Sequence, residues 1–244
     1  MTGNIAFPMY DVNPAATDTL AAAVLRHFPN ARFQRPADLL SHWQDDNLLL
    51  SQTCGYPLMT ALNEVQVVGC FHYTASGCEG INYRSRLVAR QTEAGKRLDD
   101  FRGQVVACNS PDSQSGHHAL RNSVGHDDTF FRSIVWTGSH RQSLSALQNG
   151  TADIAAIDGV SLALFARYQP QALKELTVVG ETPLTPGLPL ITSRHTSAQT
   201  LNALREVLRE IAGEAEITAP LLIGGFSPAS RRDYDVILKA SSCV

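Results

Sequence analysis

Hydrophobic and polar positions change their period repeatedly along the first eighty residues. Short apolar runs bounded by polar or turn-forming residues predict three strands: NIAFPMY at 4–10, NLLLSQT at 47–53 and VQVVGCFHY at 65–73. Apolar residues at helical spacing predict a helix over 13–28, namely Leu20, Val24, Leu25 and Phe28, and shorter helices are expected at 36–43 and 56–63. This alternation of strands and helices indicates a mainly parallel sheet flanked by helices.

A second series of strands and helices follows. Strands are expected at 83–90, 104–110, 133–138 and 152–158. Helices are expected at 94–103, 113–124, 139–150 and 159–168. Ser139 is a candidate N-cap, and Gly103 and Gly150 are candidate C-caps. The repetition predicts a second α/β lobe.

The segment 176–193 combines prolines and glycines with apolar pairs, so it is expected to be extended and to cross between lobes. A long helix at 197–213 and a polar tail follow. We therefore expect two α/β lobes, the first formed by 1–85 and 186–244 and the second, inserted lobe formed by 86–185. A cleft between two such lobes is a favoured place for a small ligand.

The bulk composition narrows the possible function classes. A net charge of −3 gives no basic field for nucleic acid, and no apolar run approaches the ~20 residues that span a membrane. The N-terminus lacks the basic and apolar regions of a secretory signal, which favours the cytoplasm, or the periplasm if a signal has been removed. An odd number of cysteines without a CxxC pair predicts reduced thiols and neither a metal nor another cofactor: Cys54, Cys70, Cys78, Cys108 and Cys243.

The stretch SPDSQSG lies between a predicted strand and a predicted helix. The first N–H groups of a helix have no partner inside it and carry the positive end of its dipole, so anions bind there. Ser113 and Ser115 add hydroxyl donors, and Gln114 adds an amide donor. Gly116 lets a ligand approach the backbone. The alternative is structural: Asp112 or Ser113 caps the helix and the other serines face solvent.

Two further residues are expected at the same edge of the second sheet. His140 lies in the first turn of the helix predicted at 139–150, where the dipole disfavours a charged ring, and Asp158 ends the strand predicted at 152–158. The carboxyl ends of parallel strands share one edge, so both residues should lie near the serine loop. Each also has a structural explanation, because His140 can face solvent and Asp158 can cap the next helix.

Three segments in this order and spacing, RGQVVACNSPDSQSG, TGSHRQSLSALQNGTADIAAID and VVGETPLTPGLP, resemble the phosphate/phosphite/phosphonate-binding proteins of ABC importers. That family has the type 2 periplasmic binding protein fold, so the resemblance implies a two-lobed "Venus flytrap" that binds a small oxyanion, performs no catalysis and serves an ABC permease. The ligand-binding residues that it implies are Ser113, Gln114, Ser115, His140 and Tyr83, with Thr53 in place of an aromatic donor and with Tyr56 and Tyr10 as neighbouring candidates.

The chain also departs from the family pattern. Gln114 replaces a hydroxyl residue. Relatives that bind an aminophosphonate hold its ammonium group with acidic residues, whereas Val160 and Leu188 stand at those positions here. The resemblance therefore argues against an aminoalkylphosphonate, although Asp158 is a possible substitute for the missing acids.

Two other functions stay open, an enzyme on the same bilobal fold that performs cofactor-precursor chemistry and a cytoplasmic sensor that reports ligand occupancy to a signalling partner. Ser113, Ser139 and Ser143 are possible nucleophiles, but no GxSxG motif accompanies them, so binding is favoured over catalysis. The adjacent His117 and His118 project about 100° apart on a helix, so we interpret them as part of a solvated helix and not as metal ligands.

Overall fold

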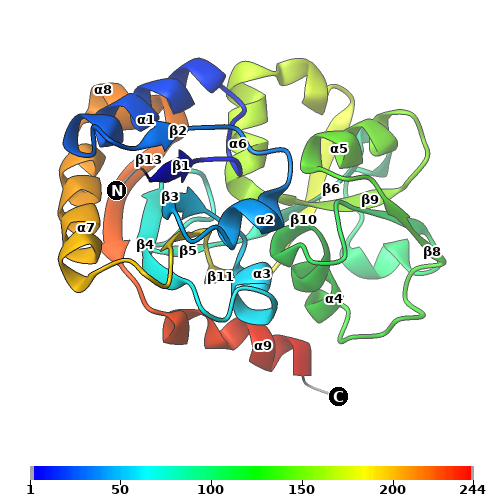
Figure 1. Cartoon of the computed structure of the whole chain (residues 1–244). Helices are drawn as coiled ribbons and strands as arrows, with labels where there is room; N and C mark the ends of the chain where they lie inside the picture. Colours follow the sequence, from blue (N-terminus) through cyan, green and yellow to red (C-terminus); the bar gives the residue numbers. More distant parts are fainter. Residues whose placement is uncertain (1–2, 243–244) are drawn as a thin grey trace. The chain divides into compact units, whose positions relative to one another are not determined.

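The structure is a computed structural model that describes residues 3–242, so Cys243 lies outside the described residues (Figure 1). The chain divides into two compact units. Unit 1 contains residues up to Thr74, Cys78–Asn82 and Pro186–Leu238, and unit 2 contains Ala75–Gly77, Tyr83–Thr185 and the chain from Lys239. Residues 83–85 belong to unit 2, unlike in the expected division, because Ser85 pairs with Asp158 in the second sheet. The connecting strands β5 (Asn82–Tyr83) and β11 (Thr185–Pro186) form a two-stranded sheet.

Unit 1 is built on a six-stranded sheet. In spatial order its strands are β13 (Ile223–Pro228), β4 (Gln66–Tyr73), β12 (Pro189–Thr192), β3 (Leu48–Gln52), β1 (Asn4–Ala6) and β2 (Arg32–Phe33). The β2–β1 and β1–β3 pairs are parallel, whereas β12 is antiparallel to both β3 and β4, and β13 is antiparallel to β4. The expectation of a mainly parallel sheet is therefore wrong in its pairing, because the returning strand β12 inserts between β3 and β4.

Helices flank this sheet. They are α1 (Pro14–His27), α2 (Leu39–Trp43), α3 (Gly55–Thr60), α7 (Ala198–Ala212), α8 (Ala215–Thr218) and α9 (Asp235–Ser242). Side-chain caps mark two of the starts, since Asn13 accepts a hydrogen bond from the N–H of Ala16 and Ser197 accepts one from the N–H of Thr200. In Figure 1, α7 runs along β13 and β4. The expected polar tail is wrong, because it folds into α8, β13 and α9.

Unit 2 is built on a five-stranded sheet in the order β10 (Leu176–Glu181), β6 (Ser85–Arg90), β9 (Ile154–Asp158), β7 (Val105–Cys108) and β8 (Ser133–Trp136). The three strands β9, β7 and β8 are parallel, while β6 is antiparallel to both β9 and β10. This sheet is also mixed, with parallel pairing confined to the half that carries the candidate site. Its core includes Leu87, Phe101, Val106 and Leu120.

The helices of unit 2 are short. A π-helical turn at Gln114–His118 continues into α4 (Ala119–Ser123), and α5 (His140–Gln148) and α6 (Gly159–Tyr168) follow β8 and β9. Ser139 is the N-cap of α5, as expected, and accepts from the N–H of Gln142. The helix expected at 94–103 is wrong: only a 3₁₀ turn, Leu98–Phe101, forms there. Gly95 has a φ angle of 90°, which a right-handed helix cannot contain, whereas Gly103, with a φ angle of 75°, has the left-handed conformation expected of it.

Within residues 3–242, we find no helix that is long and apolar enough to cross a membrane.

Candidate functional site

The serine loop, His140 and Asp158 follow the ends of three neighbouring strands in unit 2. The loop comes after β7, His140 comes after β8, and Asp158 is the last residue of β9. Because β9, β7 and β8 are adjacent and parallel, the structure places these three segments at one edge of the sheet. This is the arrangement that the sequence predicts for them.

Ser113 has the structural role that was kept open as an alternative. Its Oγ accepts a hydrogen bond of 3.0 Å from the N–H of Gly116, so it caps the helical segment. Its carbonyl oxygen accepts from the N–H groups of both His117 and His118, at 3.2 and 3.0 Å, and the second of these bonds makes the turn π-helical. The hydroxyl proton of Ser113 is not used by the cap and can donate elsewhere.

Ser115 joins the serine loop to the start of α5. Its Oγ lies 2.9 Å from Nε2 of His140, and its carbonyl oxygen accepts a bond of 2.8 Å from Oγ of Ser85. Ser85 stands opposite Asp158 in the β6–β9 pair, so the chain of contacts reaches the third segment of the edge. Ser115 and Ser85 are both buried. These contacts fix the direction of the Ser115 side chain.

His140 carries a neutral ring at physiological pH, because burial lowers the pKa of His140 to about 4. The direction is the one expected from the helix dipole at the start of α5, but the cause is burial. The second ring nitrogen, Nδ1, is buried and has no hydrogen-bond partner among the described residues. The neutral ring has one nitrogen that donates a hydrogen bond and one that accepts. Nε2 contacts the Ser115 hydroxyl, and Nδ1 can bond to a further group.

Gly116 lies directly next to the Asn109 side chain and does not face open space. A Cβ added at Gly116 would lie 1.8 Å from Oδ1 of Asn109 and 3.2 Å from Cε1 of His140. The Asn109 carboxamide and the His140 ring thus pack over this glycine. The position of Gly116 in the loop was expected to serve ligand access, and the structure shows instead that side chains of the same unit fill the space next to its Cα.

Asp158 acts as a helix cap in the structure. Its Oδ1 accepts hydrogen bonds from the N–H groups of Val160 and Ser161, at 2.8 and 2.9 Å.

The other candidates of unit 2, Gln114 and Tyr83, are buried, at 1% and 3% exposure. Val160 is fully buried at the start of α6 and offers no acid to an ammonium group.

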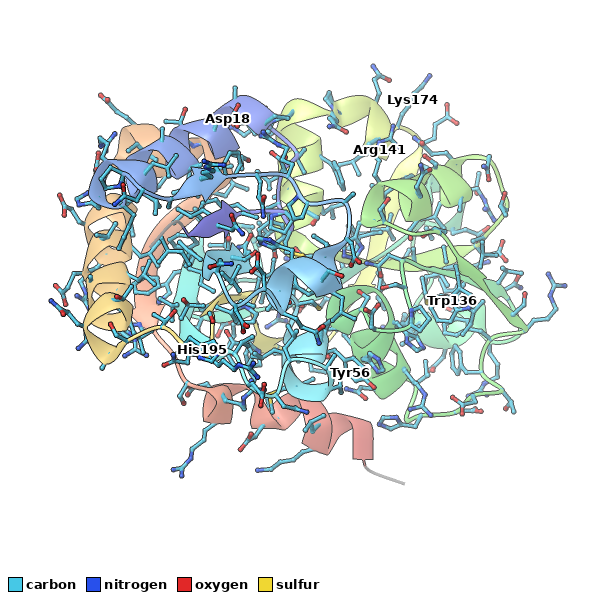
Figure 2. The ribbon with its side chains drawn as sticks, in the orientation of Figure 1. Asp18, Tyr56, Trp136, Arg141, Lys174 and His195 are labelled. Atoms are coloured by element: carbon cyan, nitrogen blue, oxygen red, sulfur yellow. The ribbon has the colours of Figure 1, made fainter. Side chains whose placement is uncertain are left out.

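The three candidates of unit 1 divide into two settings. Tyr10 and Thr53 follow the parallel strands β1 and β3 at their carboxyl ends. The Tyr10 ring meets Tyr73 edge-on at 5.0 Å, and the buried hydroxyl of Thr53 has no hydrogen-bond partner among the described residues. Tyr56 lies on α3, where it packs against the core cluster that contains Trp43 (Figure 2).

The adjacent histidines hold the serine loop. Nδ1 of His117 and Nε2 of His118 lie 3.0 and 2.8 Å from the carbonyl oxygen of Pro111. Burial and the neighbouring His117 lower the pKa of His118 to about 4. Within the described part of the chain, no group of three or more metal-ligating side chains comes together.

Sequence reasoning did not find Ser85 or Asn109. The alternation of β6 points Ser85 away from the side on which Arg84 and Arg86 lie, and this single polar residue between two arginines was the available signal. Asn109 directly follows β7, but its contact with Gly116 depends on how the chain folds back after the strand. Neither contact is readable from spacing alone.

Residues 34–234 match the model of a family described as the phosphonate-specific periplasmic substrate-binding proteins of ABC transporters. No curated protein matches the chain. The family is periplasmic, so the expected cytoplasmic location has no support from it. A small phosphonate-type ligand and an ABC permease are the partners that such a family implies, and a signalling partner is not among them.

Solved structures share the fold at low sequence identity. A binding-protein component of an ABC phosphonate transporter from Pseudomonas aeruginosa has a TM-score of 0.81 at 16% identity, covering 99% of this chain and 86% of its own. PhnD1 from Prochlorococcus marinus, solved with methylphosphonate, has a TM-score of 0.80 at 13% identity, covering 98% and 97%. A Xanthomonas citri protein bound to ATP has a TM-score of 0.74 at 12% identity, covering 100% and 97%. These similarities confirm the two-lobed α/β fold.

Proposed function

This chain belongs to the phosphonate family of periplasmic substrate-binding proteins of ABC transporters, and from that membership we propose that it binds a small phosphonate- or phosphate-like oxyanion at the carboxyl edge of β7, β8 and β9. The observation that carries this proposal is the 2.9 Å contact between Oγ of Ser115 and Nε2 of His140. It joins two segments, each at the start of a helix, into one cluster of donors.

The donors at this edge are sufficient for useful affinity. The 2.9 Å hydrogen bond between Ser115 Oγ and His140 Nε2 uses one of the two protons that this pair carries. Three donors therefore remain for a ligand: the hydroxyl of Ser113, the N–H of Ser115 at the start of the helical segment, and one proton from either the Ser115 hydroxyl or the His140 ring. A hydrogen bond to a charged group contributes roughly 1.5–3 kcal/mol. Three such bonds are therefore of the order that micromolar binding requires, about −8 kcal/mol.

The remaining candidates keep the same role in this proposal. Gln114 and Tyr83 are ligand contacts of unit 2, and Tyr10, Thr53 and Tyr56 are ligand contacts of unit 1. Thr53 is favoured among the three of unit 1 because its buried hydroxyl has no partner among the described residues. Asp158 is a cap first, and we expect its replacement to act on α6 before it acts on the ligand.

The pair of Ser115 and His140 has the spacing of a nucleophile and its base, yet we propose binding without catalysis. A general base works best with a pKa near the working pH, whereas burial lowers the pKa of His140 to about 4. A catalytic histidine is also oriented by a third group, and Nδ1 of His140 has no partner among the described residues. Both features disfavour proton abstraction from Ser115.

We also propose that the protein acts in the periplasm and delivers its ligand to an ABC permease, as its family membership implies. Fractionation of the native host tests the location, and recovery of the protein only with cytoplasmic markers would contradict it.

A thermal-shift panel tests the ligand class, with phosphate, phosphite, methylphosphonate, sulfate and nucleoside monophosphates as additives. We expect at least one phosphorus oxyanion to raise the midpoint by several degrees, since saturating ligand stabilises the folded state by mass action. Ser115→Ala should reduce the shift, while Ser123→Ala on α4 is the matched control because, among the described residues, its hydroxyl bonds only to the carbonyl of Ala119. A panel without any shift would refute the proposal, and turnover of a panel member would favour an enzyme.

A further inference from the structure

Two buried polar atoms beside Gly116 have no hydrogen-bond partner in the described structure. They are Oδ1 of Asn109 and Nδ1 of His140. Both side chains lie over the same glycine, as the distances to an added Cβ of 1.8 Å for Asn109 Oδ1 and 3.2 Å for His140 Cε1 show. Buried polar atoms in native proteins almost always have a partner. Two exceptions over one glycine, next to the serine loop, indicate that a ligand supplies the missing bonds.

The group that would meet Asn109 Oδ1 must be a hydrogen-bond donor, because a carboxamide oxygen only accepts. The hydroxyl of Ser113 and the N–H of Ser115 can donate, and the Ser115–His140 pair has one further proton to donate, because the other lies in the bond between Oγ and Nε2. The edge therefore offers several donors and one acceptor. A fully ionised phosphonate has only acceptor oxygens, whereas its singly protonated form has one O–H that donates.

The arginines next to Ser85 and His140 in the sequence have partners elsewhere in unit 2. Arg84 and Arg86 both pair with Glu181 on the side of the strand opposite to Ser85. Arg141, on α5 beside His140, is exposed and donates to Oγ of Ser145 (Figure 2).

The other titratable groups around the cluster come from the packed elements β7, the serine loop, the π-helical turn and β9: Cys108, Asp112, His117, His118 and Asp158. Burial raises the pKa of the Cys108 thiol to about 12, so it is neutral. The two histidines are engaged with the Pro111 carbonyl, and Asp112 is exposed. Asp158 is buried at the end of β9, where its Oδ1 accepts from the first N–H groups of α6.

We propose that this site selects the singly protonated monoanion of its phosphonate- or phosphate-type ligand, with Oδ1 of Asn109 accepting the hydrogen bond from the ligand's P–OH group. The proposal rests on the proposed function. It adds the charge state of the bound ligand and the residue that recognises this charge state. The hydroxyl of Ser113, the N–H of Ser115 and the one proton of the Ser115–His140 pair that does not lie between them donate to the remaining oxygens. Sulfate and sulfonates carry no such proton. Their oxygens would face the lone pairs of Asn109 Oδ1, so these ligands bind weakly.

Calorimetric titration tests this with methylphosphonate and methanesulfonate, from about pH 5 to about two pH units above the second ionisation of the phosphonate. For the wild type, the Kd for methylphosphonate should rise about tenfold for each pH unit above that ionisation, as the competent fraction of the ligand falls. Methanesulfonate should bind at least about 100-fold more weakly at the acidic end, because a site built for a hydroxyl rejects analogues that lack it.

Three variants test whether Asn109 causes the preference for methylphosphonate over methanesulfonate. Asn109→Ala should reduce the ratio of the two dissociation constants by about tenfold or more. Asn122→Ala should leave the ratio unchanged, because Asn122 also has a buried Oδ1 without a described partner but lies on α4, seven residues beyond Ser115. His140→Gln should keep the pH dependence of methylphosphonate binding, since the proton in question belongs to the ligand.

Several outcomes would overturn the inference. A Kd for methylphosphonate that stays constant or falls through its second ionisation would show that the dianion is bound, and so would loss of the pH dependence in His140→Gln, which would place the proton on the ring. Equal binding of methanesulfonate would remove the role of Asn109. In all three cases the proposed function survives, because the phosphonate still binds. No binding of methylphosphonate at any pH would contradict both proposals.

Discussion

Replacing Ser115 by alanine separates the two roles that a serine-rich turn can have. The substitution removes the Oγ that contacts Nε2 of His140 at 2.9 Å, but it keeps the carbonyl that accepts from Ser85. The lost neutral hydrogen bond costs about 0.5–1.5 kcal/mol of folding stability. Alanine is a better helix former than serine and offsets about 0.5 kcal/mol of this. We therefore expect the free energy of unfolding to fall by no more than about 1 kcal/mol.

The effect on the ligand should be larger. If Oγ of Ser115 donates to an oxyanion, its loss costs roughly 1.5–3 kcal/mol, which weakens Kd by about 10- to 150-fold. Calorimetric titration with methylphosphonate gives the Kd, and urea unfolding without ligand gives the stability. Ser113→Ala is the comparison, because its Oγ caps the segment through the N–H of Gly116 and its loss should cost about 1 kcal/mol of stability in addition to any loss of binding.

The reasoning would be refuted if Ser115→Ala bound the ligand within about twofold of the wild type. It would be refuted equally if its loss of stability matched that of Ser113→Ala while binding stayed intact. Either result would make the serine loop a set of helix caps and nothing more.

Four further predictions concern His140, Gly116 and the cysteines. His140→Gln should make the protein less sensitive to acid: because burial holds the pKa of the folded ring at about 4, below the usual 6.5, the unfolded chain binds more protons as pH falls through that window and the folded state loses stability there. Urea unfolding at neutral and acidic pH measures this, and equal losses in both proteins would contradict it. Gly116→Ala should weaken methylphosphonate binding at least about tenfold by displacing Asn109, whose Oδ1 would lie 1.8 Å from the new methyl group, and an unchanged Kd in calorimetry would contradict this. Thiol titration of the denatured protein under anaerobic conditions should count five thiols, because Cys54, Cys70, Cys78 and Cys108 are all present as thiols in the structure, and a count of three would reveal a disulfide. In the native protein Cys78 should react before Cys70, because burial raises the pKa of the Cys70 thiol to about 12, and the reverse order would contradict the fold around it.

Local patterns in the sequence predicted most helices and strands because each is dictated by its own residues. Asn13, Ser139 and Ser197 cap helices that begin close to where the apolar spacing places them. Strand order is different, because the position of β12 between β3 and β4 depends on contacts between residues that are far apart in the chain. No local pattern carries that information.

The strand β13 was missed for a local reason. Its sequence IGGFSP contains two glycines and ends in proline, which reads as a turn and not as a strand. The structure explains the first glycine, since a Cβ at Gly224 would lie 2.6 Å from Cγ2 of Thr74. The strand packs too closely for a side chain there, and such a close approach cannot be read from hydrophobic periodicity.

The sequence was sufficient to predict at which edge of the second sheet the candidate site lies. The spacing of strands and helices placed the serine loop, His140 and Asp158 together in unit 2, because parallel strands share one carboxyl edge. The roles of the individual atoms were not predictable. Whether an oxygen of Ser113 caps a helix, or an oxygen of Asn109 lacks a partner, is decided by distances of about one ångström that only folding sets.

A crystal structure of the protein grown with methylphosphonate tests the central claim most directly. We predict a tetrahedral anion at the carboxyl edge of β7, β8 and β9, within hydrogen-bond distance of Oγ of Ser115 and of the His140 ring or Oδ1 of Asn109. An anion bound elsewhere in the chain, or an edge without an anion at a ligand concentration that saturates binding in solution, would contradict the account.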